Sequence, residues 1–313
     1  MIRRKIQLIA GTTYSVSLPK EWVKKNNLKE KEEVSLFEKN DRTLVISPLN
    51  IRVQDISDVS LNVDEYSQNI EQILFAVYYK GTENITLSSK KEITKSAKIS
   101  IRRALAHMSG AEIIYEDKQT IKIKILLDKS KVDIYQLLYR INLLIESSIL
   151  NIQEDMVIAE IKINENEIDR LFHLMSKIIT ISLVDSNVLH SSKIEDISLI
   201  PSYFLIGKRL ENIGDNINAL SAYLSSHKKV FNENKREIFH FIKSELNKAI
   251  THIIRKPNIA FQKTSDEALI GINERLAKLK DKAILGYLTT IIRYVIDIDE
   301  ETTLIAFYKA WQP

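Results

Sequence analysis

The chain has 313 residues, a formal net charge of only +4 and 44% hydrophobic residues, which is ample for packed cores in about two domains. It contains no cysteine, which excludes disulfides, iron–sulfur clusters, thiolate zinc sites and thiol catalysis. No apolar run approaches the roughly 18 residues that span a bilayer, and the N-terminus turns polar too early for a signal peptide. We therefore expect a cytoplasmic protein that is not embedded in a membrane.

The first 50 residues predict a compact β-β-α-β-β unit. Apolar and polar residues alternate with the period of half-buried strands at residues 5–10, 14–18, 34–37 and 43–47. Pro19 favours a short helix over residues 19–26, because its fixed φ suits the first helical position. Asn40 and Asp41 are typical of a turn. A unit of this size has too little interior to be stable alone, so we expect it to dimerise by exchanging strands.

Positive charge is concentrated at the start of this unit. Residues 1–25 contain six lysines and arginines against a single glutamate, a local excess of five charges, while the rest of the chain is nearly balanced. Such an excess suits a polyanion such as DNA. A solvated charged face is the other interpretation of the same pattern.

A resemblance to swapped-hairpin DNA-binding modules of the AbrB/MazE/SpoVT type is carried by the string RKIQLIAGTTYSVSLPKEWVKKNNLKEKEEVSLFEKNDRTLVISP. It implies an intertwined homodimer whose basic strands and loops lie against duplex DNA. The positions that would contact DNA are Arg3, Arg4, Lys5, Lys20 and Lys24. The sequence departs from the pattern at Val23, where AbrB-like sequences often carry a basic residue. A module that only dimerises and binds protein is the alternative.

Residues 51–128 predict a small α/β segment of order α-β-α-β-β. The expected elements are helices at 66–79 and 91–108 and strands at 84–87, 112–116 and 120–126. Arg102, Arg103 and His107 share one face of the second helix, where they would suit an anion. Charged residues in this arrangement are more often solvated, and we interpret them in that way.

From residue 129 onward the sequence predicts a helical bundle. Six helices are expected at residues 133–153, 164–184, 199–226, 232–255, 265–282 and 285–310. Residues 209–223 match residues 293–307 at an offset of 84, with Asp215 over Asp299. This spacing fits two three-helix repeats, at about 129–227 and 228–313.

The repeated motif RLENIGDNINALSAY, with the upstream string NENEIDRLFHLMSKI, resembles PhoU-domain proteins, whose two three-helix repeats carry ExxxD-type motifs. The layout of the whole chain resembles archaeal PhoU-like phosphate uptake regulators. The resemblance implies an α+β multidomain protein of phosphate homeostasis, with a phosphate transporter or its sensor as a partner. It also implies metal clusters on the bundle surface, as some PhoU-domain proteins have.

Two acidic pairs at i, i+4 spacing are the candidate metal ligands: Glu165 with Asp169, and Glu211 with Asp215. Residues four apart stand on one helix face, so each pair directs its oxygens at one spot. Oxygen ligands favour divalent ions such as Mg²⁺, Mn²⁺ or Ca²⁺, with iron also suitable. His173, four residues after Asp169, is positioned to add a nitrogen ligand.

These pairs are expected on the surface of the bundle. On a helical wheel Glu211 and Asp215 fall nearly opposite the apolar seam, and Gly207 and Gly214 on their side leave that face open. Lys208 is spaced to neutralise Glu211, so ordinary surface charge is the alternative interpretation.

The second repeat departs from the pattern. Val295 stands at the position of Glu211, which leaves Asp299 without a partner four residues earlier. We therefore expect at most one metal cluster, with Asp299 as an optional further ligand. Arg209 and Arg293 also match across the repeats, and a structural ion pair explains them better than an anion site.

The six histidines form no arrangement typical of a metal-dependent hydrolase, so we expect no enzyme activity. The preferred interpretation is a DNA-binding regulator of phosphate uptake, with a bundle that senses metal, phosphate or a transporter or sensor protein. The alternative is an adaptor that regulates a phosphate-transport complex through the bundle and uses the N-terminal module only to dimerise.

Overall fold

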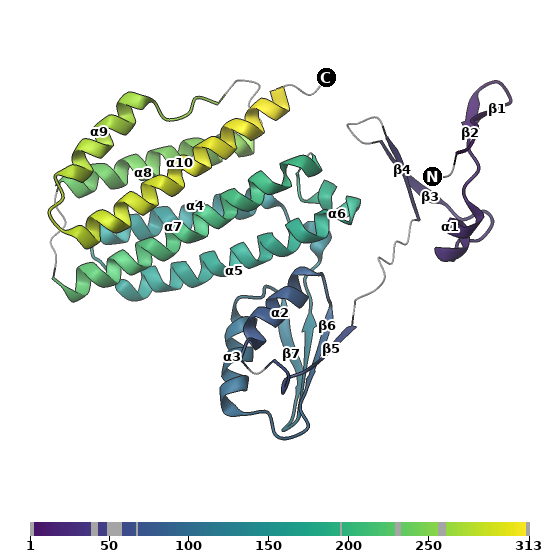
Figure 1. Cartoon of the computed structure of the whole chain (residues 1–313), viewed down its shortest axis with the longest axis horizontal. Coiled ribbons are helices and arrows are strands. Elements are labelled where there is room, and N and C mark those ends of the chain that lie inside the picture. Colours follow the sequence, from purple (N-terminus) through teal and green to yellow (C-terminus); the bar gives the residue numbers. More distant parts are fainter. Residues whose placement is uncertain are drawn as a thin grey trace. The chain divides into compact units, whose positions relative to one another are not determined.

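The computed structural model describes residues 3–38, 43–48, 58–66, 68–194, 196–228, 233–255 and 261–310. The chain divides into two compact units, residues 1–55 and residues 56–313 (Figure 1). Within the described ranges, no helix is both long and apolar enough to cross a membrane.

The first unit has the β-β-α-β-β order that the sequence predicts. Its elements are β1 (Gln7–Ile9), β2 (Thr13–Ser15), α1 (Lys20–Lys25), β3 (Val34–Glu38) and β4 (Leu44–Pro48). β1 pairs with β2 and β3 with β4, in two separate antiparallel sheets. Ala10 and Gly11 turn the first hairpin with φ angles of 51° and 75°, the left-handed conformation typical of tight hairpin turns. The turn predicted at Asn40 and Asp41 lies outside the described residues.

The first unit has almost no interior of its own. Among its described residues only Ser47 is buried, and both hydrophobic cores of the chain lie outside it. Large apolar side chains are exposed at Ile6, Leu8, Ile9, Tyr14, Val16, Leu36 and Leu44. An exposed apolar surface of this extent typically marks a site of association.

Residues 58–125 form an α/β domain. Its elements are β5 (Asp58–Asn62), α2 (Ile70–Tyr79), β6 (Asn84–Ser88), α3 (Lys95–Ala106), β7 (Ala111–Glu116) and β8 (Thr120–Ile125). The strands form one sheet of order β5-β6-β8-β7, in which β5 and β6 are parallel and the other neighbours antiparallel. The sequence prediction lacks β5, whose two apolar residues, Val59 and Leu61, are too few to mark a strand by alternation.

The α/β domain has its own core. Alternate residues of the central strands are fully buried, as at Ile85 and Leu87 of β6 and Ile121 and Ile123 of β8. They pack in one cluster with apolar residues of α2 and α3, such as Leu74. This arrangement holds the end of α3 and the residues after it at a fixed place beside the sheet.

The helical region follows. Its helices are α4 (Ile134–Gln153), α5 (Ile158–Ser182), α6 (Ser186–Ser191), α7 (Ile200–Ser226), α8 (Glu233–Arg255), α9 (Asp266–Ala277) and α10 (Lys282–Ala310). All six predicted helices are present, with their ends shifted by up to six residues. α6 occupies a segment predicted to separate two helices. It forms because the Asp185 side chain accepts hydrogen bonds from the backbone N–H groups of Asn187 and Val188 and so caps the helix.

α7 lies at the centre of the bundle's contacts. It packs along α5 and α10, while α4 packs against α5 and α8 (Figure 1). The apolar faces of these helices form one continuous core. Between α7 and α10, Arg209 Nε lies 2.7 Å from Asp297 Oδ2. The interpretation of Arg209 as part of a structural ion pair is therefore confirmed.

Candidate metal centre and nucleic-acid interface

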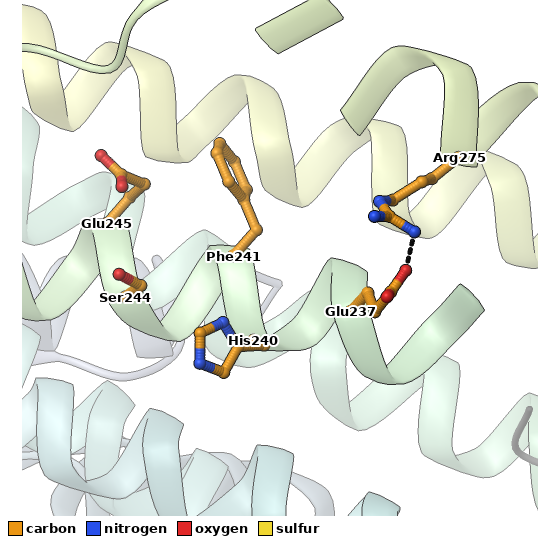
Figure 2. Close-up of a pocket in the computed structure, with 6 residues that line it drawn as sticks. All are labelled: Glu237, His240, Phe241, Ser244, Glu245 and Arg275. Carbon is orange, nitrogen blue, oxygen red and sulfur yellow. Dashed lines mark ion pairs between the residues drawn. The ribbon is translucent and has the colours of Figure 1, made fainter. Parts of the chain in front are cut away.

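A cavity of about 320 Å³ opens between α8 and α9 (Figure 2). Its lining consists of Glu237, His240, Phe241, Ser244, Glu245 and Arg275. Arg275 forms an ion pair with Glu237, and Glu245 accepts hydrogen bonds from Thr264 and Lys248. These contacts tie α9 and the segment before it to α8. The lining includes none of the predicted metal ligands.

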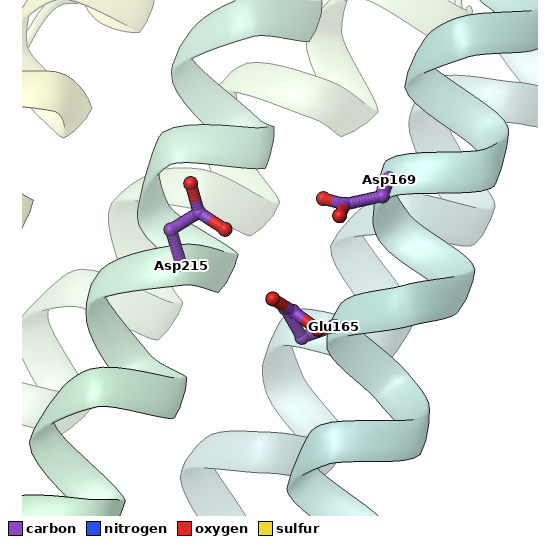
Figure 3. Close-up of side chains that lie close together, drawn as sticks. All are labelled: Glu165, Asp169 and Asp215. Carbon is purple, nitrogen blue, oxygen red and sulfur yellow. The ribbon is translucent and has the colours of Figure 1, made fainter. Parts of the chain in front are cut away.

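The predicted acidic pairs meet where α5 packs against α7. Glu165 and Asp169 on α5 and Asp215 on α7 each offer a carboxylate oxygen within 4.8 Å of the others (Figure 3). Glu211, the fourth predicted ligand, lies beside this group, and its carboxylate accepts a hydrogen bond of 2.6 Å from Lys208. We call Glu165, Asp169 and Asp215 the carboxylate cluster. The structure thus brings three of the four predicted ligands together from two helices.

Two glycines allow α7 to approach α5 closely at this point. A Cβ atom on Gly207 would lie 2.7 Å from Met175 Sδ, and one on Gly214 would lie 3.0 Å from Ile168 Cδ1. The prediction that these glycines leave an open face is therefore wrong. A residue without a side chain exposes backbone against which the neighbouring helix can pack, and both glycines are buried.

The carboxylate cluster consequently lies at the contact between two helices and not on a freely exposed surface. Glu165 is buried, Asp169 is half-buried and only Asp215 is exposed. The expectation of a surface site is corrected in this respect. The helical wheel treated the large apolar residues as the whole contact surface and took the glycines as open space, whereas they are the points where α5 packs against α7.

Burial among several carboxylates disfavours ionisation. Desolvation, followed by the negative charges of Glu165, Asp215 and Glu211, raises the pKa of Asp169 to about 7. Desolvation is also the main cause that raises the pKa values of Glu211 and Asp215. Lys162 Nζ lies 2.6 Å from Glu165 Oε2 and neutralises part of this charge. The net excess of negative charge favours a bound cation.

The two optional ligands lie outside the carboxylate cluster in the described structure. His173 Nδ1 is hydrogen-bonded to the Tyr79 hydroxyl, and its ring stacks on Phe75 with centroids 3.9 Å apart. Burial lowers the pKa of His173 to about 4. Asp299 is buried on α10, where it accepts hydrogen bonds from the backbone N–H and the hydroxyl of Thr264.

A histidine that the sequence placed among solvated charges lies beside the carboxylate cluster. His107, the residue after α3, has its Nδ1 atom 4.0 Å from Asp169 Oδ2, and that nitrogen is buried. Burial lowers the pKa of His107. The solvated interpretation is therefore wrong for this residue. No pattern in the sequence connects it to Asp169, because the two residues belong to different domains.

Arg102 and Arg103 do not join His107 in an anion site. Their guanidinium groups form ion pairs of 2.7 Å and 3.1 Å with Glu116 and Glu71. Both arginine side chains remain more than half exposed, at 59% and 63%. For these two residues the interpretation as solvated charge is confirmed.

The predicted DNA contacts are all exposed. Arg3, Arg4 and Lys5 precede β1, and Lys20 and Lys24 lie on α1. Among the described residues, none of these five side chains forms an ion pair. Their charges are therefore available to phosphate groups.

The first unit is also recognised by comparison with known families. Residues 7–53 match the model of the family described as antidote-toxin recognition MazE, bacterial antitoxin. They form a MazE-type module. The match confirms the resemblance of the N-terminal segment to AbrB/MazE-type modules. Neither curated proteins nor solved structures give a match to the chain.

The MazE-type module divides the predicted DNA contacts into two groups. Lys20 and Lys24 lie inside it on α1: Lys20 is the first residue of the helix, and Lys24 lies in the last turn, where its charge suits the negative end of the helix. Arg3, Arg4 and Lys5 lie in the segment directly before it. Both groups can be changed without altering a buried side chain.

Proposed function

We propose that the chain is a DNA-binding regulator of phosphate uptake whose helical bundle responds to a bound metal ion. The observation that carries the DNA-binding part is the set of exposed basic residues on and beside a MazE-type module. Because none of them forms an ion pair with another described residue, no described carboxylate would compete with phosphate groups for them. Binding of this kind is strongly salt-dependent.

The exposed apolar residues of the module support a homodimer. Leu8 and Tyr14 are cross-strand partners on one hairpin, and Leu36 lies on the other. All three are more than half exposed in the single chain. A second copy of the module that exchanged strands would cover this surface and place two sets of basic residues on one duplex.

The phosphate part of the proposal rests on the resemblance of residues 209–223 to PhoU-domain proteins. In this interpretation α4, α5 and α7 form one three-helix repeat and α8, α9 and α10 the other. The partner would be a phosphate transporter or its sensor, and the protein would act as a regulator and not as an enzyme.

The metal part rests on the carboxylate cluster. One oxygen of Asp169 is buried without a hydrogen-bond partner in the described structure, and a cation would satisfy it. Glu165, Asp169 and Asp215 would hold the ion, which would compensate the repulsion between their charges. Because these three residues lie on α5 and α7, binding of the ion would affect the packing of both helices.

The deciding experiment is a salt titration of binding to duplex DNA from the region upstream of the protein's own gene, against random duplex. We expect a preference for the upstream fragment and a steep loss of affinity between about 50 and 200 mM salt. Changing Arg3, Arg4 and Lys5 together to alanine should reduce the slope of log K against log salt by up to ~3. The matched control changes Lys90, Lys91 and Lys118 of the α/β domain, which are also exposed, and should leave the slope unchanged.

A second candidate is an adaptor that does not bind DNA. The apolar surface of the module favours it, because dimerisation alone would account for that surface. The family description also names a bacterial antitoxin, and in an antitoxin the helical region would contact a toxin. Flat, negligible DNA binding at low salt would exclude the regulator and leave these protein-binding functions.

A further inference from the structure

The α/β domain and α5 are held together by directional contacts on both sides of His107. Arg170 Nη1 of α5 donates to Ser109 Oγ at 2.9 Å, two residues beyond His107. The Tyr79 hydroxyl of α2 is hydrogen-bonded to His173 Nδ1 of α5. The end of α3 is therefore fixed against the part of α5 that carries Asp169.

His107 presents to this contact a ring nitrogen without a hydrogen-bond partner. Its Nδ1 atom lies 4.0 Å from Asp169 Oδ2, which is too long for a hydrogen bond. Asp169 Oδ1 is also buried and has no partner among the described residues. Two buried polar atoms of neighbouring side chains thus lack a hydrogen-bond partner, which costs free energy unless a further group satisfies them.

We propose that His107 is a ligand of the metal ion at the carboxylate cluster, so that the ion joins the α/β domain to the helical bundle. This inference rests on the metal site proposed above. Ligand atoms about 2.1 Å from one ion stand roughly 3.0–3.4 Å apart at octahedral or tetrahedral angles. Closing the 4.0 Å gap between His107 Nδ1 and Asp169 Oδ2 therefore requires a shift of up to about 1 Å. His107 lies outside the group whose ligand atoms are all within 4.8 Å of one another, so the ring must also move toward Glu165 and Asp215.

The ring of His107 is suited to this role. Its Nδ1 atom is buried and has no hydrogen-bond partner among the described residues, so this nitrogen is available to a metal ion. His173, which the sequence suggested as the nitrogen ligand, already uses its Nδ1 atom with Tyr79 and is stacked on Phe75. His173 keeps its Nε2 atom, but neither of its ring nitrogens lies within 4.0 Å of a carboxylate oxygen among the described residues, whereas His107 Nδ1 does. We therefore assign the nitrogen ligand to His107 of the α/β domain.

A histidine ligand changes the class of ion that the site selects. Three carboxylates alone suit Mg²⁺ and Ca²⁺. An added imidazole favours Fe²⁺, Ni²⁺ or Zn²⁺, and Mn²⁺, which carboxylates also suit, serves as the spectroscopic probe. The site is thus expected to prefer a first-row transition metal to Ca²⁺.

The test measures Mn²⁺ bound to the full-length protein by pulsed electron paramagnetic resonance, which detects a directly coordinated nitrogen. The comparison covers the unchanged protein, His107→Gln, His173→Gln and His190→Gln, the last at an exposed histidine on α6. Labelling all histidines with ¹⁵N in the unchanged protein identifies a histidine ligand without any substitution. We expect the nitrogen coupling to disappear only in His107→Gln, with an Mn²⁺ affinity at least ~10-fold lower and a Ca²⁺ affinity changed less than 3-fold.

Three results would overturn the inference. Coupling that persists in His107→Gln and disappears in His173→Gln would restore the sequence-based assignment. Tight Mn²⁺ binding without any nitrogen coupling would show that His107 is not a ligand, while the carboxylate site itself would stand. If the unchanged protein binds Mn²⁺ no better than Asp169→Asn does, the proposed metal site itself is refuted. If His107→Gln fails to fold, His173→Gln still decides between the two rings. A nitrogen coupling that this variant retains, and that changes when its histidines carry ¹⁵N, comes from a histidine other than His173.

Discussion

Gly214 of α7 faces Ile168 of α5 so closely that a Cβ atom on residue 214 would lie 3.0 Å from Ile168 Cδ1. Each of these residues is the immediate neighbour of a cluster carboxylate, Asp215 and Asp169 respectively. The spacing between the two helices therefore sets the distance between the carboxylates. Packing and the candidate metal centre depend on the same contact.

Gly214→Ala should reduce Mn²⁺ affinity, because pushing α7 from α5 separates Asp215 from its partners. For stability, the matched control is Gly286→Ala on α10, where an added Cβ meets nothing within 4 Å. The control should gain up to ~1 kcal/mol in free energy of unfolding from helix propensity. Gly214→Ala should be less stable than the control by about 1–3 kcal/mol because of overpacking. Equal stability and equal affinity in the two variants would contradict the assigned role of the glycine.

Metal binding should weaken at acid pH through Asp169. Its pKa is raised to about 7 by desolvation and by neighbouring carboxylates, and a proton on this carboxyl competes with the ion. Mn²⁺ affinity at pH 6 should therefore be about tenfold lower than at pH 8, with most of the change below pH 7. Calorimetric titrations at several pH values measure this. Asp155→Asn, an exposed control, should keep the full pH dependence.

Asp299 should make the metal-free protein less stable as the pH rises. The Thr264 hydroxyl lies against Asp299 Oδ2 and also against Glu245 Oε2, although it has one hydrogen to donate. Desolvation is the main cause that raises the pKa of Asp299. Its contribution to stability is present below the unfolded pKa near 4 and is lost as the pH rises through the higher folded value.

Asp299→Asn should flatten this pH dependence. The free energy of unfolding of the variant minus that of the unchanged protein should be more favourable at pH 8 than at pH 4. Chemical denaturation at the two pH values measures this difference. Lys248, which interacts with Glu245, is the nearest cation to consider, and it is present in both proteins. Parallel stability curves for the two proteins would show that folding does not shift the pKa of Asp299.

The full-length protein should dimerise through the MazE-type module. Leu8→Glu combined with Tyr14→Glu places charges on two exposed cross-strand partners and should weaken the dimer by at least ~100-fold, given the apolar area such side chains bury. Sedimentation velocity over a concentration series measures this. Ile163→Glu, at a side chain of α5 that is 66% exposed, is the control and should leave the dimer intact.

Helical periodicity made much of the carboxylate cluster predictable. Glu165 and Asp169 stand four residues apart, which places both on one face of α5 in any regular helix. Their meeting with Asp215 required the packing of two helices, which spacing within one helix does not specify. Glu211 has the same spacing from Asp215, yet its carboxylate is held by Lys208 beside the cluster. Spacing does predict the Lys208 contact, but Glu165 keeps an equivalent contact with Lys162 inside the cluster. The packing of the two helices, and not the lysine, therefore decides which carboxylates meet.

His107 could not have been found in the same way. It follows α3 in a domain with a separate core, and its distance from Asp169 depends on how that domain packs against α5. Its charged neighbours Arg102 and Arg103 made it resemble part of a solvated face. The strand β5 was missed for a related reason. Its own five residues are too short an alternating pattern to predict a strand, and the pairing with β6 that stabilises it is not visible in the sequence.

Among the described hydrophobic residues that are partly buried, Leu127 is the one that packs against both the core of the α/β domain and the core of the bundle. The two cores are otherwise formed by separate sets of residues. Native-state hydrogen exchange should separate them, with amides of β6 and β8 exchanging through local openings that leave α7 protected. An ion held between His107 and Asp169 would slow these openings, so that exchange rates in the sheet would report on an event in the bundle.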